Sequence, residues 1–309
     1  MYLNKAFKLL GFTIDYSKVS PDFLLEHKSG RTLNVEAVTS NKPSKNEIDA
    51  SKLSEEDFLN YSSLKLHRKI SDKRDLFLGI NGKKHPYSSL EHVKGKPFVV
   101  AIAPFDNDLS FSQNNTAINK VLFGIEPPKQ NPDGSISAMK TSHIETYSGE
   151  KVEVGIFTND SFKEISAVIF STTGMFGKAV LQGGIDCTVK STRYRQSNIV
   201  DFLSTEGSKK LGMTQTKLSG THEVFSFRQP LEDIVFGSDM HLCDSSEHTE
   251  THLDGFHIYY NPYADIPLDK DIFQAYEITH NFYDTSAKEM ICNHNDGSLV
   301  SRQVFTQHI

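Results

Sequence analysis

Two strand-like stretches decide the fold of the N-terminal part of this chain, Pro21-Asp22-Phe23-Leu24-Leu25-Glu26 and Leu33-Asn34-Val35-Glu36-Ala37-Val38-Thr39. The segment between them, His27-Lys28-Ser29-Gly30-Arg31, contains the serine and glycine typical of a turn. Strands joined by so short a turn form an antiparallel hairpin. We therefore expect Asp22 and Glu36 to lie side by side on neighbouring strands.

The alternation of side chains along a strand indicates which way the two acids point. In the second stretch the odd-numbered residues 33–37 form one apolar face, and Glu36 lies on the other face. In the first stretch Phe23 and Leu25 share a face, and Asp22 lies opposite. Both carboxylates are thus expected to project away from the apolar side. The alternative is a half-solvated hairpin whose acids are ordinary surface residues.

Paired carboxylates on adjacent strands can hold a hard divalent cation such as Mg²⁺, which prefers oxygen ligands. A cation held in this way can polarise a phosphodiester and activate water. Asp22 and Glu36 are therefore candidate metal ligands of a phosphodiester hydrolase. Asp106 and Asp108 follow the apolar stretch Phe98–Ala103 and could add a carboxylate near a strand end, or simply form a turn.

The composition indicates a soluble globular protein, because 37% of the 309 residues are hydrophobic and 23% are charged. We find no apolar run that approaches the ~20 residues of a membrane span, and no signal-peptide pattern at the N-terminus. Three widely spaced cysteines are typical of a reducing compartment rather than of a disulfide framework. We expect a cytoplasmic protein with no membrane partner.

The charge balance bears on possible nucleic-acid binding. The net charge of −6 counts against a dedicated nucleic-acid binder, whose domain would often be basic. Local basic clusters, such as Lys42–Lys45 and His67–Arg74, partly offset this. Short charge runs are also common on solvated surfaces, so these clusters do not decide the partner.

The order of expected elements indicates an α/β fold with a mixed sheet. We predict helices over 2–10, 57–78 and 114–123, strands over 12–16 and 98–103, and the hairpin described above. A helix between two strands of one sheet crosses over its face. The Pro- and Gly-rich segment 126–134 suggests a boundary, with a core over 1–128 and a strand-rich C-terminal extension over 129–309 that could complete the same sheet. Residues 165–170 are expected to form a buried strand, and 179–181 to continue that sheet.

The order helix, strand, Pro21-Asp22 strand, Val35-Glu36-Ala37-Val38 strand, helix resembles the PD-(D/E)XK nuclease superfamily, which has the restriction-endonuclease-like fold. The resemblance covers about residues 1–125. It implies that Asp22, Glu36 and the backbone carbonyl of Ala37 bind Mg²⁺ or Mn²⁺. It also implies a nucleic-acid substrate, with DNA expected first and RNA as the alternative, and a role in phage defence or DNA repair.

The resemblance further implies a catalytic lysine two residues after the glutamate, where this chain has Val38. Some members of the superfamily supply that lysine from the following helix. In the predicted 57–78 helix, Lys73 lies on the same stripe as Leu66 and Ile70, and Lys69 borders it. An amine on a sheet-facing stripe needs a partner or must reach out to water. We therefore take Lys73, and after it Lys69, as candidate catalytic residues; the alternative is a Lys73 that pairs locally, for example with Asp72, or only reaches water.

A second resemblance runs through most of the chain. The phrases Glu91–Ile102, Ile165–Ser171 and Tyr260–Ala264 are similar to those of a group of bacterial proteins of about this length. This similarity supports the architecture more than any chemistry.

Two other functions remain open at this level. With Val38 in the usual lysine position and a negative net charge, the chain could be an inactive nuclease-fold protein that serves as a binding or scaffolding subunit, with a protein partner or a second copy. His248 and His252 also have the spacing that places two imidazoles on one helix face for zinc, although Thr249 stands where a metalloprotease needs glutamate.

Overall fold

The computed structural model describes residues 2–41, 52–83, 85–105, 114–130, 136–146, 148–174, 176–205 and 211–306. Lys42–Lys45, Asp106 and Asp108 lie outside the described residues. The helices are α1 (Tyr2–Leu9), α2 (Glu55–Leu78), α3 (Thr116–Phe123), α4 (Phe176–Gln182) and α5 (Ile199–Thr205). A short 3-10 helix, η2 (Tyr87–Ser89), lies in the connection from α2 to the next strand.

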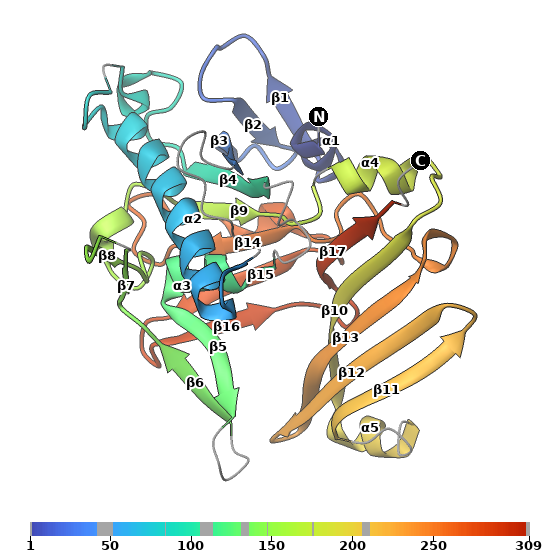
Figure 1. Ribbon diagram of the computed structural model, residues 1–309. Coiled ribbons are helices and arrows are strands. Elements are labelled where there is room, and N and C mark those ends of the chain that lie inside the picture. Colours follow the sequence, from blue (N-terminus) through green and yellow to red (C-terminus); the bar gives the residue numbers. More distant parts are fainter. Residues whose placement is uncertain are drawn as a thin grey trace.

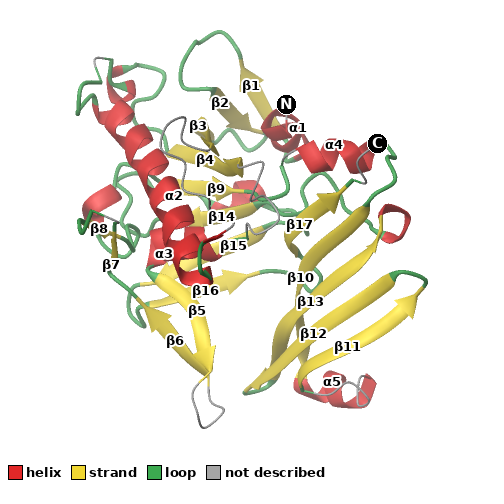
Figure 2. Ribbon diagram, viewed as in Figure 1, coloured by secondary structure: helices red, strands yellow, loops and turns green. Residues whose placement is uncertain are grey.

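The described strands form two main sheets (Figures 1 and 2). In spatial order, the eight-stranded sheet contains β1 (Phe12–Asp15), β2 (Phe23–His27), β3 (Thr32–Asn41), β4 (Phe98–Phe105), β9 (Ala167–Phe170), β14 (His257–Tyr260), β15 (Thr279–Asp284) and β16 (Glu289–Asn293). The five-stranded sheet contains β11 (Gly212–Ser219), β12 (His222–Leu231), β13 (Ile234–Asp244), β10 (Thr188–Asn198) and β17 (Leu299–Phe305). Two small hairpins pair β5 (Ile125–Gln130) with β6 (Ile136–Lys140), and β7 (His143–Glu145) with β8 (Lys151–Glu153).

The chain is thus a mixed α/β protein with helices on the large sheet and an antiparallel second sheet in its C-terminal part. The large sheet is mixed, because β1, β2 and β3 are antiparallel whereas β3, β4 and β9 run parallel. The helix α2 makes the crossover from β3 to β4, as the order of elements predicted. The position 128/129 falls within β5, and β9, β14, β15 and β16, which follow it in the chain, belong to the same sheet as β1–β4.

Both faces of the large sheet are covered, and β4 shows why. Val99 and Ala101 belong to the core on the α1 side, whereas Phe98 and Val100 belong to the core beneath α2 and α3. Burying each large side chain of this kind contributes about 1.5–3 kcal/mol. The prediction that the apolar run 98–103 forms a strand buried on both faces is therefore confirmed.

The ends of α2 fix the helix that crosses the candidate site. Ser54 caps its N-terminus by accepting a hydrogen bond from the backbone N–H of Asp57 at 3.1 Å. Gly79 ends it with a positive φ of 72°, where a Cβ would lie 2.8 Å from Pro86. The helix starts at Glu55, two residues before the predicted start, because capping rather than apolar periodicity sets the boundary.

One predicted strand is wrong. Residues 179–181 belong to α4, in which Lys178 and Val180 are buried whereas Phe176 and Ala179 are exposed. A short apolar run does not distinguish a strand from a short helix by periodicity alone.

No helix in the described residues has the length and apolarity that a bilayer span requires. Cys187, Cys243 and Cys292 are free thiols.

Candidate functional site

The β2–β3 hairpin brings Asp22 and Glu36 together at the point where β2 begins. Phe23 pairs with Val35 in the antiparallel register, so the preceding Asp22 lies beside Glu36. The backbone N–H of Asp22 donates to Glu36 Oε2 at 3.3 Å, and the backbone N–H of Ala37 donates to Asp22 Oδ2 at 2.8 Å. Each acid is therefore held by the backbone of the neighbouring segment.

The two acids differ in exposure. Asp22 is exposed at the sheet edge, whereas Glu36 is 5% exposed and lies beneath α2. Asn34, two residues earlier on the same face, is fully buried. The alternative of a half-solvated hairpin is therefore wrong for Glu36, because α2 covers the face that the hairpin pattern alone leaves to solvent.

The helix α2 supplies a cation to this pair. Lys73 Nζ lies 2.7 Å from Glu36 Oε1, and its side chain is 20% exposed. Leu66 and Ile70, on the same stripe of the helix, are buried against the sheet. Lys69 has no hydrogen bond or ion pair to any residue that the structure describes. The acid that pairs with Lys73 is therefore Glu36 rather than Asp72.

Tyr87 completes the surroundings of Glu36, and sequence reasoning missed it. It lies in η2, and its hydroxyl donates to Glu36 Oε1 at 3.5 Å. Its ring packs edge-on against Phe98. Burial and the nearby charges of Glu36 and Asp22 raise the pKa of Tyr87 to about 12, so the phenol stays protonated at neutral pH. No local pattern marks a tyrosine in a polar loop as part of a site.

The same connection between α2 and β4 also holds the segment before Asp22. A ring nitrogen of His92 lies 2.8 Å from the carbonyl oxygen of Ser20. The connection between α2 and β4 therefore contacts the site on two sides, through Tyr87 and through His92.

The arrangement fits a hard divalent cation. A residue in a strand directs its N–H and C=O to the same side, so the Ala37 carbonyl points toward Asp22, as its N–H does. The pairing of β2 with β3 ends at Phe23 and Val35, so no residue of β2 pairs with Ala37. Within the described ranges no three His, Cys, Asp or Glu side chains form a metal-binding group. Two carboxylates and a carbonyl, completed by water, suit Mg²⁺ or Mn²⁺ better than zinc.

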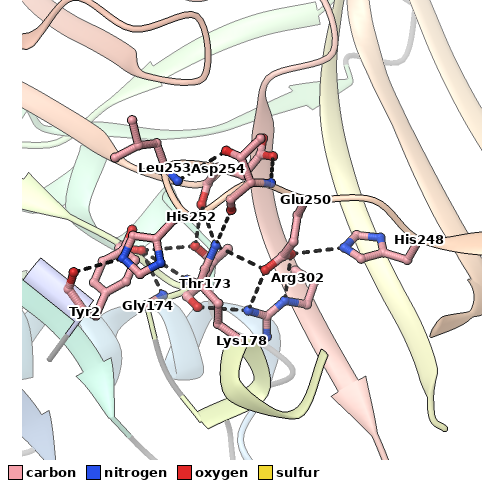
Figure 3. A network of polar contacts seen from close by, with 12 residues as sticks. Tyr2, Thr173, Gly174, Lys178, His248, Glu250, His252, Leu253, Asp254 and Arg302 are labelled. Carbon is pink, nitrogen blue, oxygen red and sulfur yellow. Dashed lines mark hydrogen bonds and ion pairs between the residues drawn. The ribbon is translucent and has the colours of Figure 1, made fainter. Parts of the chain in front are cut away.

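The zinc alternative does not have the geometry that its spacing requires. His248 and His252 lie in a loop rather than on a helix, so the i, i+4 spacing does not give them a common face. His248 contacts Glu250, with Nε2 and Oε2 3.0 Å apart, and His252 contacts the carbonyl oxygen of Tyr2 at 3.0 Å (Figure 3). We therefore discard a zinc site at these two residues.

Glu250 instead organises a buried polar network between α4 and β17 (Figure 3). Arg302 donates to both carboxylate oxygens at 3.1 and 3.2 Å, and Lys178 Nζ lies 3.1 Å from Oε1. Burial by itself raises the pKa of Glu250, but the hydrogen bond from His248 and the cations of Arg302 and Lys178 outweigh it and lower the pKa to about 2. The carboxylate is ionised and fully partnered within the protein.

No family model, no curated protein and no solved structure matches this chain. The geometry by itself defines a mixed α/β protein with two acids, a lysine and a tyrosine gathered at the edge of its large sheet.

Proposed function

We propose that this chain is a metal-dependent nuclease with a restriction-endonuclease-like core, which hydrolyses phosphodiester bonds. One observation carries the proposal: Asp22 and Glu36 converge from neighbouring strands, and Lys73 approaches Glu36 to 2.7 Å from the crossover helix. Two acids and a lysine that converge from separate elements are the groups that metal-assisted phosphodiester hydrolysis requires.

Each group has a role in this proposal. Asp22, Glu36 and the carbonyl of Ala37 would hold the ion. When bound, Mg²⁺ polarises the phosphodiester and helps to deprotonate the attacking water. The ammonium of Lys73 would stabilise the negative charge that builds on the phosphate, because a preorganised cation costs no reorganisation during the reaction. Tyr87 would hold Glu36 in place through its protonated hydroxyl.

The origin of the lysine supports this assignment. Val38 lies on the same face of β3 as Glu36 and packs partly against the core beneath α2. Lys73 reaches that face from α2 instead, so the positive charge missing from β3 is supplied by the helix above it. We take DNA as the first substrate to test and RNA as the second, and defence or repair as the cellular setting.

A second function is favoured by one observation. Both oxygens of Glu36 already have partners within the protein: Lys73 and Tyr87 on Oε1, and the N–H of Asp22 on Oε2. A carboxylate satisfied in this way could be purely structural. The chain would then be a binding or scaffolding subunit that keeps the nuclease architecture without its chemistry.

A nuclease assay with a matched control separates the two functions. Single- and double-stranded DNA and RNA are incubated with Mg²⁺ or Mn²⁺ and with wild type, Glu36→Ala or Glu26→Ala. Glu26 is an exposed acid of the same hairpin and serves as the control. We expect cleavage by wild type and Glu26→Ala and none by Glu36→Ala, with the heat of Mg²⁺ binding lost only in the last. Equal cleavage by all three proteins would reject this active site, and no cleavage by any would favour the binding subunit.

A further inference from the structure

The edge of β3 is open next to the two acids. Pairing between β2 and β3 ends at Phe23 and Val35, yet β3 continues to Asn41. On that side, no strand in the described part of the chain pairs with β3 beyond Val35. Because backbone groups two residues apart point the same way in a strand, the N–H and C=O of Thr39 face the same open side as those of Ala37.

A pocket of about 410 Å³ lies at this open edge. Phe23 and Ala37, the residues that directly follow Asp22 and Glu36, are both part of its wall. Ala101 and Ile169 extend the apolar lining, and Thr39 and Ser171 add hydroxyl groups. The pocket therefore opens mainly on the face of the sheet that α1 covers, opposite to Glu36 and Lys73. Asp22 lies at the open edge between the two faces, because its Oδ2 accepts a hydrogen bond from the N–H of Ala37 at 2.8 Å.

The lining selects against charge. Among the described residues that line the pocket there is no Asp, Glu, Lys, Arg or His. A phosphate would be poorly served there. The ion that Asp22 and Glu36 would hold at the open edge of β3, and Lys73 on the opposite face, would serve it instead. The pocket instead suits a flat apolar group with a hydrogen-bonding rim, and its volume lies within the roughly 300–1,000 Å³ of small-ligand sites.

We propose that this pocket receives one unstacked nucleobase of the substrate strand, beside the phosphate that is cut. A nucleobase has two apolar faces, which side chains such as the Phe23 ring and aliphatic groups can cover. Its edge carries donors and acceptors, which backbone groups and hydroxyls can satisfy. This inference rests on the proposed nuclease function and narrows its substrate to nucleic acid with an unpaired nucleotide at the cleavage position.

The energetic consequence concerns fully paired duplexes. A base inside a duplex must be unpaired and unstacked before it can enter a pocket, which costs a few kcal/mol. In single strands, and in duplexes with one bulged or mismatched nucleotide, the base is already unpaired, so less free energy is needed to move it into the pocket. The chain is therefore a nuclease for unpaired nucleotides.

The first test needs no cleavage. Binding of adenosine and cytidine, which carry no phosphate, is followed by NMR without metal in wild type, Ala103→Phe, Ala287→Phe and Glu36→Ala. Ala103 lines the pocket and the new ring would fill it, whereas Ala287 lies exposed in a distant turn. We expect binding to weaken at least 10-fold only in Ala103→Phe. Equal binding by Ala103→Phe and Ala287→Phe, or no binding by wild type, overturns the pocket.

The second test uses wild type alone, so it does not depend on whether the filled variant folds. Cleavage is compared on a single strand, a fully paired duplex, a duplex with one unpaired nucleotide and a single strand with abasic positions. We expect at least 10-fold faster cleavage wherever an unpaired base is present, and loss of that advantage at abasic positions. Equal rates on all four substrates overturn the inference but leave the nuclease intact. Nucleoside binding without any cleavage overturns the nuclease but leaves the pocket intact.

Discussion

Two buried glutamates in this molecule each pair with a lysine, yet their surroundings differ. Lys73 Nζ lies 2.7 Å from Glu36, and Lys178 Nζ lies 3.1 Å from Glu250. Lys178 is 5% exposed and Lys73 is 20% exposed. Glu250 also pairs with Arg302 and His248, whereas Glu36 lies beside the exposed Asp22. A lysine–glutamate ion pair can thus belong to a closed structural network, as at Glu250, or lie beside an exposed acid, as at Glu36.

The difference lies in what a ligand can reach. Every polar neighbour of Glu250 comes from the protein and is buried with it, so a substrate could enter only by breaking the network. At Glu36 the second acid, Asp22, is exposed, and the next residue of β3, Ala37, lines a pocket on the other face of the sheet. The number and strength of ion pairs therefore do not identify a functional site. An exposed acid beside a buried one, as Asp22 is beside Glu36, is the more informative feature.

The largest expected effect is a loss of stability when Glu250 is removed from its buried network. Glu250→Ala leaves Lys178 and Arg302 buried without their carboxylate, which should cost about 3–5 kcal/mol of unfolding free energy. Glu36→Ala should cost less than about 2 kcal/mol, because Lys73 can turn its ammonium to water. Urea unfolding of both variants and the wild type measures the two costs. A Glu36→Ala variant that is destabilised as much as Glu250→Ala would make both pairs structural.

The second effect concerns pH. Because the folded-state pKa of Glu250 is lowered to about 2 from an ordinary 4.5, its stabilisation is complete above pH 4.5 and is lost as pH falls towards 2. The loss should be on the order of 3 kcal/mol. Unfolding free energies measured between pH 6 and pH 2 should fall more steeply for wild type than for Glu250→Gln. Parallel curves would show that Glu250 does not contribute in this window.

The third effect distinguishes two lysines on one helix. Lys73→Met should reduce cleavage by about 100-fold, or roughly 2.7 kcal/mol of transition-state stabilisation. Lys69→Met should stay within about 3-fold of wild type, because Lys69 contacts neither acid. Single-turnover cleavage rates, with Mg²⁺ affinity from calorimetry as the second readout, test this pair. The assignment fails if Lys69→Met is the variant that loses activity.

The smallest effect concerns Tyr87. Its hydroxyl lies 3.5 Å from Glu36 Oε1, near the limit of a hydrogen bond, so Tyr87→Phe should slow cleavage less than about 10-fold. The pKa of Tyr87 is raised to about 12. The cleavage rate of the wild type should therefore not change through ionisation of this tyrosine below about pH 11. A pH–rate profile of both proteins checks this. Loss comparable to that of Lys73→Met would give the hydroxyl a direct part in the chemistry.

Several features of the site could be predicted because they depend on short-range patterns. The turn at residues 27–31 and the alternation on either side of it gave the hairpin and the pairing of Asp22 with Glu36. The stripe on α2 that contains Leu66 and Ile70 indicated that Lys73 rather than Lys69 faces the sheet. The run 98–103 predicted a strand buried on both faces. Each of these follows from periodicity and turn chemistry within a few residues.

Other features depend on contacts between distant segments, which no local pattern contains. Tyr87 joins the site because η2 folds back over β3, which brings it to Glu36, 51 residues away in the sequence. The short run 179–181 lies in a helix whose Val180 packs with Val189 and Cys243 of the five-stranded sheet. Periodicity cannot anticipate contacts between segments that lie tens of residues apart in the sequence.

The sequence by itself determined the mixed α/β order, the hairpin that holds the acids and the helix face that carries Lys73, because strand alternation and helical periodicity are properties of neighbouring residues. Only the tertiary structure decided which acids are accessible. Whether a carboxylate is enclosed, as those of Glu250 and Glu36 are, or exposed at an open strand edge, as that of Asp22 is, depends on the packing of elements brought together by the whole chain.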